Sequence, residues 1–136
     1  MGGDDIKGVI QNVARKQQIN DFSGLQFGNI TPTDIDGIIE YKNTSYIIIE
    51  VKYMDTPLPY GQKLFIGRFI VDVPKPAICI VATHSEHDTN NHVNVGDCLV
   101  REVFIKNELR WREPVAPLTV RELCNRFIDR VNSGKI

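Results

Sequence analysis

The stretch TPTDIDGIIEYKNTSYIIIEVKY, residues 31–53, determines the fold predicted for this 136-residue chain. Residues 33–41 and 45–53 are rich in Ile, Val and Tyr, which favour β-strands. Between them, residues 42–44 (KNT) are polar and typical of a turn. We therefore expect a β-hairpin. Its second strand should be central in a sheet, because three consecutive isoleucines make both of its faces apolar.

The length of the hairpin loop sets which side chains face each other. If residues 42–44 form the loop, Tyr41 pairs with Ser45, and Asp36 then lies directly opposite Glu50. Opposed Cβ atoms are roughly 4.5–5.5 Å apart, so two carboxylates there repel unless one is protonated or a cation lies between them. Such a pair suits Mg²⁺, which binds few carboxylates and keeps several waters. A register shifted by two residues would place Asp34 opposite Glu50 instead, so Asp34 is an alternative.

Apolar periodicity predicts the remaining elements. We expect helices over residues 4–18, 60–71 and 119–132, a short strand over 24–30, a strand covered on both faces over 77–83, and a second hairpin over 98–105 and 108–112. Helix 60–71 should be buried through Leu64, Phe65, Phe69 and Ile70. The order is α-β-β-β-α-β followed by β-β-α. The expected fold class is therefore mixed α/β, with residues 1–136 forming one domain.

Composition restricts the class of protein. The chain is 42% hydrophobic and 24% charged, as in ordinary globular proteins, and its net charge of −1 means that nucleic-acid binding would need a local basic patch. No apolar run approaches the ~18 residues of a membrane span. The acidic N-terminus lacks the apolar core of a signal peptide, so we expect a cytoplasmic protein without a membrane partner. Three widely spaced cysteines argue against both a disulfide framework and a thiolate zinc site.

Asp36, followed by Glu50-Val51-Lys52 at the end of an apolar strand, resembles the PD-(D/E)xK nuclease motif. Type II restriction enzymes, archaeal Holliday-junction resolvases and many phage nucleases share this motif. The α-β-β-β-α-β order predicted over residues 4–83 is similar to the core of the restriction-endonuclease-like fold, a mixed central sheet flanked by helices. The resemblance implies a Mg²⁺- or Mn²⁺-dependent deoxyribonuclease that hydrolyses phosphodiester bonds of DNA.

The resemblance also implies roles for individual residues. Asp36 and Glu50 would be the acidic metal ligands, and the Val51 backbone carbonyl would be a further ligand. Lys52 would orient or activate the attacking water and offset charge on the phosphate. Gln62 lies one turn into the helix after the lysine, where similar nucleases often carry a glutamine that helps to hold the site. Because no separate DNA-reading module accompanies the motif, we expect a homodimer or an accessory protein within a larger complex.

The chain departs from the family pattern in one respect. Many members supply a metal-binding glutamate from the first helix, yet no glutamate precedes Glu40, and Gln11 or Asn12 could replace it only without its charge. The alternative is therefore a catalytically lapsed nucleic-acid-binding module of the same fold.

Two further features allow more than one interpretation. The histidine-rich loop 84–92 is expected to be solvated, with substrate contact through His84 or a small metal-binding module as alternatives. Trp111 is expected to close an edge of the core, with stacking on a base as its alternative.

Overall fold

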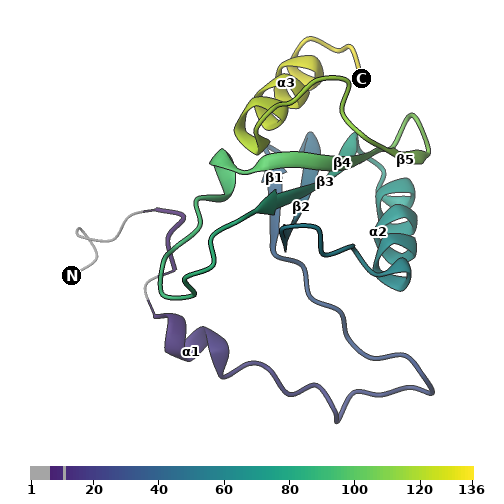
Figure 1. Ribbon diagram of the computed structural model, residues 1–136. Helices are drawn as coiled ribbons and strands as arrows, with labels where there is room; N and C mark the ends of the chain where they lie inside the picture. Colours follow the sequence, from purple (N-terminus) through teal and green to yellow (C-terminus); the bar gives the residue numbers. More distant parts are fainter. Residues whose placement is uncertain (1–6, 11) are drawn as a thin grey trace. The chain divides into compact units, whose positions relative to one another are not determined.

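The computed structural model describes residues 7–10 and 12–136 (Figure 1). The chain divides into two compact units, one reaching to Thr33 and the other spanning Asp34–Ile136. The first unit contains a short helix, α1 (Val13–Gln17). The second contains all the strands found in the described residues, together with Asp36, Glu50, Lys52 and Gln62.

A five-stranded mixed sheet forms the centre of the second unit. Its strands, in spatial as well as chain order, are β1 (Gly37–Tyr41), β2 (Ser45–Tyr53), β3 (Ala77–His84), β4 (Leu99–Ile105) and β5 (Arg110–Arg112). Strands β2 and β3 are parallel, and the other neighbours are antiparallel. A parallel pair needs a crossover connection, and helix α2 (Tyr60–Asp72) provides it. Strands β2, β3 and β4 are interior strands of the sheet, and the isoleucine run predicts this position for β2.

Two apolar clusters cover the two faces of this sheet. On one face, Ile66 and Ile70 of α2 pack against alternate residues of β2 and β3, including Ile48 and Cys79. On the other face, Phe127 of helix α3 (Val120–Asn132) packs against the β2 and β3 residues that alternate in sequence with those of the first cluster. Successive strand side chains point to opposite faces, so alternate residues of the apolar runs serve the two clusters. The α/β fold class is confirmed at this level.

The predicted hairpin register is confirmed. Tyr41 pairs with Ser45 and Gly37 with Ile49, and positive φ angles at Lys42 (50°) and Asn43 (58°) turn the chain between the strands. The predictions for helix 60–71, strand 77–83, the second hairpin and helix 119–132 also agree with the structure. Helix α3 begins at a capping box in which Thr119 and Glu122 bond to each other's backbone N–H groups.

The strand predicted over residues 24–30 is wrong. Phe27 and Ile30 exchange backbone hydrogen bonds of 2.8 and 3.0 Å around Gly28, whose φ is +64°. This local turn replaces an extended strand and leaves only an isolated bridge. The first sheet strand also begins at Gly37 rather than at residue 33. The observed order is α-β-β-α-β followed by β-β-α, one strand fewer than the predicted restriction-endonuclease-like core.

The N-terminal helix is also shorter than predicted. Of the expected span 4–18, residues 4–6 and 11 lie outside the described residues, and residues 7–10 form a turn and bend. Gly8 has a φ of +89°, which a right-handed helix does not accommodate. The Asn12 side chain accepts a hydrogen bond from the Arg15 backbone N–H and caps α1 at its start.

The buried face of α2 agrees with the prediction at Ile70 and differs from it at Leu64, Phe65 and Phe69. Ile66 and Ile70 are fully buried, whereas Leu64, Phe65 and Phe69 are each more than one-third exposed. Residues four apart lie on one stripe of a helix, and the stripe through Ile66 and Ile70 is the one that faces the sheet. The phenylalanines lie one position earlier and are turned partly outward. None of the helices in the described ranges combines the length and apolarity needed to cross a membrane.

We predict that stability depends strongly on the interior of β3. Ile80 is fully buried, so Ile80→Ala should lower the free energy of unfolding by about 2–5 kcal/mol through lost burial and a residual cavity. Ile38→Ala on the edge strand β1, where the side chain is 53% exposed, is the matched control and should cost less than about 1 kcal/mol. Urea unfolding measures both variants. Equal losses would contradict this assignment of the core.

Candidate active site

Asp36 and Glu50 meet where β1 begins and β2 approaches its end. The Asp36 backbone N–H donates to Glu50 Oε2 at 3.1 Å, and the Val51 backbone N–H donates to Asp36 Oδ2 at 2.7 Å. Both bonds lie just beyond the last register pair of the hairpin, Gly37–Ile49, because Asp36 directly precedes Gly37 and Glu50 directly follows Ile49. The structure therefore brings the two predicted carboxylates together, and it places Asp36 rather than Asp34 opposite Glu50.

Gln62 joins this pair from the first turn of α2. Its side-chain amide Nε2 donates to Glu50 Oε1 and, at 3.2 Å, to the backbone carbonyl of Asp34. One glutamine thus connects the segment before β1, the end of β2 and helix α2. Asp34 contributes its carbonyl to this contact, and its exposed carboxylate acts on Glu50 through charge alone.

Glu50 is the buried charge of the site. The residue is only 2% exposed, and this burial raises the pKa of its carboxyl to about 7. The Asp36 N–H bond stabilises the ionised form and lowers the pKa, whereas the negative charges of Asp36 and Asp34 raise it. The net effect is a carboxyl that changes protonation near neutral pH.

Lys52 lies two residues beyond Glu50 on the same face of β2, as strand alternation predicts. It is half-buried and pairs in register with Thr83 of β3. Among the described residues, none forms an ion pair or hydrogen bond with its ammonium group. The charge of Lys52 is therefore available to a ligand at this end of the sheet.

A second pair of charged side chains lies on the same sheet face and was not predicted from the sequence. Glu102 of β4 lies one strand beyond Val81, which itself pairs with Glu50, and it forms a 2.6 Å ion pair with Lys63 of α2. The Lys63 ammonium also lies 5.4 Å from the Trp111 ring centre. Trp111 packs on Phe104 with ring centres 5.3 Å apart, which agrees with its predicted place at a core edge.

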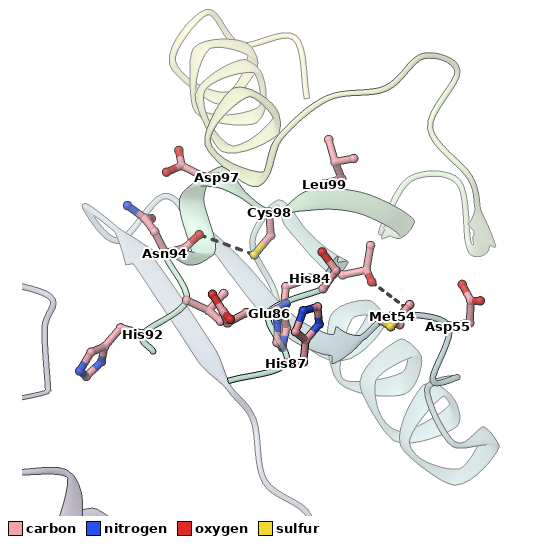
Figure 2. Close-up of a pocket in the computed structure, with 13 residues that line it drawn as sticks. Met54, Asp55, His84, Glu86, His87, His92, Asn94, Asp97, Cys98 and Leu99 are labelled. Carbon is pink, nitrogen blue, oxygen red and sulfur yellow. Dashed lines mark hydrogen bonds between the residues drawn. The ribbon is translucent and has the colours of Figure 1, made fainter. Parts of the chain in front are cut away.

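A cavity of about 710 Å³ opens at the carboxyl ends of β2 and β3, and Thr83, the register partner of Lys52, is among the residues that line it (Figure 2). All three histidines line it, and most of the loop 84–92, including His87 and His92, is exposed as predicted. His84 Nδ1 accepts a 3.1 Å hydrogen bond from the Glu86 N–H, and the His84 ring lies edge-on to Tyr53. Within residues 7–10 and 12–136, no three His, Cys, Asp or Glu side chains gather closely enough to hold a metal.

The raised pKa of Glu50 predicts a pH dependence of stability. The folded protein holds this proton up to about pH 7, whereas an unfolded glutamate loses it near its ordinary value of 4.5. The contribution of Glu50 to the free energy of unfolding should therefore be fully present below pH 4.5 and lost as the pH rises toward 7, a loss of about 1–3 kcal/mol. Urea unfolding between pH 4.5 and 8 measures this loss.

Glu50→Gln isolates the effect, because its neutral amide has no proton to lose in this range. The difference in stability between wild type and Glu50→Gln should shrink or reverse as the pH rises. Glu40→Gln, which alters an exposed glutamate of β1, should keep the wild-type slope. The same slope in all three proteins would rule out a perturbed Glu50.

Comparison with known proteins identified no relative: no family model, no curated protein and no solved structure matches this chain.

Proposed function

We propose that the protein is a metal-dependent nuclease that hydrolyses phosphodiester bonds of DNA. The observation that carries the proposal is the buried Glu50 carboxylate, held opposite Asp36 with Lys52 two residues further along the same strand face. Burying a carboxylate is costly unless a charge or hydrogen bonds compensate for it. Here two neighbouring acidic groups increase the cost, so a cation at this point would relieve it.

The residues present fit Mg²⁺ or Mn²⁺. Asp36 and Glu50 would supply one carboxylate each and Val51 its backbone carbonyl, leaving the remaining positions to water, as Mg²⁺ prefers. Each Glu50 oxygen already accepts one hydrogen bond, and a carboxylate oxygen has a second lone pair for a cation. When bound, the metal lowers the pKa of a water and stabilises charge on the phosphate.

Lys52 and Gln62 would act around this centre in different ways. The unpaired Lys52 ammonium would orient the attacking water and offset the negative charge that develops on the phosphate. Gln62 would hold Glu50 in position through the bond that it already makes. Because each chain supplies one such site, cutting both strands of DNA would require a homodimer or a partner in a larger complex.

One observation favours the alternative, a nucleic-acid-binding module without activity. The sequence before Glu40 contains no glutamate, and no group of three acidic or histidine ligands gathers in the described part of the chain. A single bound metal with few protein ligands is the most that this arrangement supports. Cleavage of plasmid DNA with and without Mg²⁺ separates the nuclease from the binding module.

The first test of this function is metal binding. Isothermal titration should show weak Mg²⁺ and tighter Mn²⁺ binding to the wild-type protein. Glu50→Gln should abolish it, because the amide lacks the charge that a hard cation needs. Glu40→Gln is the control for loss of a carboxylate elsewhere on the same hairpin. Unchanged binding in Glu50→Gln would place any cation elsewhere.

The second test concerns Lys52. Lys52→Ala should lower the single-turnover cleavage rate by about 10²–10³ while DNA affinity stays nearly constant, because the lost charge acts mainly in the transition state. Lys42→Ala, an exposed lysine at the other end of the same hairpin, should cleave at the wild-type rate. Wild-type cleavage by Lys52→Ala would remove the basis of the proposal and favour the binding module.

A further inference from the structure

The cavity lined by the histidines begins one strand away from the proposed catalytic lysine. Thr83, which pairs in register with Lys52, lines the cavity. Its hydroxyl donates to the Met54 carbonyl at 2.7 Å, and Met54 also lines the cavity. Neighbouring strands are about 4.8 Å apart, so the wall of the cavity begins one strand away from the Lys52 backbone. A strand of nucleic acid with a phosphate at Lys52 would carry its next nucleotide to this cavity.

The charge of the cavity disfavours phosphate. Asp55, Glu86 and Asp97 contribute carboxylates, and none of the described residues that line it is a lysine or arginine. Only Asp97 has a cationic partner, Arg121, at 2.5 Å. A phosphate inside the cavity would therefore meet repulsion, whereas a neutral group that presents N–H donors would find acceptors.

The shape and the remaining lining suit a flat heterocycle. The cavity holds about 710 Å³, within the range of small-molecule sites. His84 and His87 contribute planar rings, and Ser85 and Asn94 contribute a hydroxyl and an amide (Figure 2). Nucleobases combine a stacking face with edges that donate and accept hydrogen bonds, and proteins hold unpaired bases by these means.

We propose that this cavity receives one unpaired nucleobase adjacent to the scissile phosphate, so that the preferred substrate is DNA with unpaired nucleotides at the cleavage point. The inference rests on the proposed nuclease function. A base inside a duplex must first be unstacked and unpaired, and this cost is least for a nucleotide that is already single-stranded. The lysine would then face the backbone while the acidic cavity takes the neutral base.

Binding without cleavage is the first measurement. The probe is an oligonucleotide that carries one 2-aminopurine, either single-stranded or in a duplex, titrated with the Glu50→Gln protein by fluorescence and anisotropy. We expect the single strand to bind at least about tenfold more tightly than the duplex. Adding His87→Ala should remove most of this difference, and His87→Phe should restore it through ring stacking. Leu109→Ala, exposed on the β4–β5 turn, is the control and should change nothing.

Cleavage with Mg²⁺ is the second measurement, on one labelled strand presented alone, fully paired, or paired except for a short internal gap. Wild type should cut the two substrates with unpaired nucleotides faster than the duplex, and His87→Ala should lose most of this preference. Cleavage of all three at equal rates, with no effect of His87→Ala, would overturn the inference while the nuclease proposal stands. Absence of cleavage, with 2-aminopurine binding that depends on His87, would instead overturn the nuclease and leave the base site. Absence of both would overturn both.

Discussion

The contacts of the Glu50 carboxylate connect the parts of the second unit on which the candidate site depends. Its two oxygens accept hydrogen bonds from the Asp36 backbone and from the Gln62 side chain, so it joins β1, β2 and α2. A carboxylate that is only 2% exposed needs such partners, because removal from water disfavours its charge. The hairpin, the crossover helix and the segment around Asp34 are thereby held in one arrangement at the end of the sheet.

The same contacts leave the negative charge of Glu50 without a compensating positive charge within the described part of the chain. Hydrogen bonds satisfy Glu50 as an acceptor, but the nearby charges of Asp36 and Asp34 raise its pKa and add to the effect of burial. A proton removes this repulsion at low pH, and a divalent cation would remove it at neutral pH. Carboxyl groups whose pKa is raised by burial and by neighbouring negative charges are common at functional sites.

The parallel pairing of β2 and β3 explains why the carboxylates, the lysine and the large cavity occupy the same end of the molecule. Carboxyl ends of parallel strands meet at one edge, and the loops that follow them line the space beyond it. Arg101 of β4 donates to the Met54 and Thr56 carbonyls and so holds the loop after β2. These hydrogen bonds therefore help to fix the position of the end of β2, which carries Lys52, relative to the start of α2.

Local sequence was sufficient to predict the hairpin, its register, and therefore the meeting of Asp36 with Glu50. Strand side chains alternate with period two and a three-residue loop leaves one register, so no distant contact is needed. Lys52 follows from the same alternation, and the capped helix α3 from its own periodicity. The hydrogen bond from Gln62 to Glu50 depends on how the crossover helix packs on the sheet. The position of Gln62, one turn into that helix, nevertheless identified it as a candidate from the sequence.

Only the tertiary structure decided the remaining features, because they depend on segments far apart in the sequence. The Lys63–Glu102 ion pair joins α2 to β4 across 39 positions, and no local pattern predicts it. Likewise, packing of α2 on the sheet selected Ile66 over Phe65 for burial, since both lie on apolar helical positions. Residues 24–30 have strand composition but no partner strand within residues 7–10 and 12–136, and Gly28 turns them back on themselves. The histidine cavity arises where the β2 end, the β3 end and the approach to β4 come together, and that proximity is a property of the folded sheet alone.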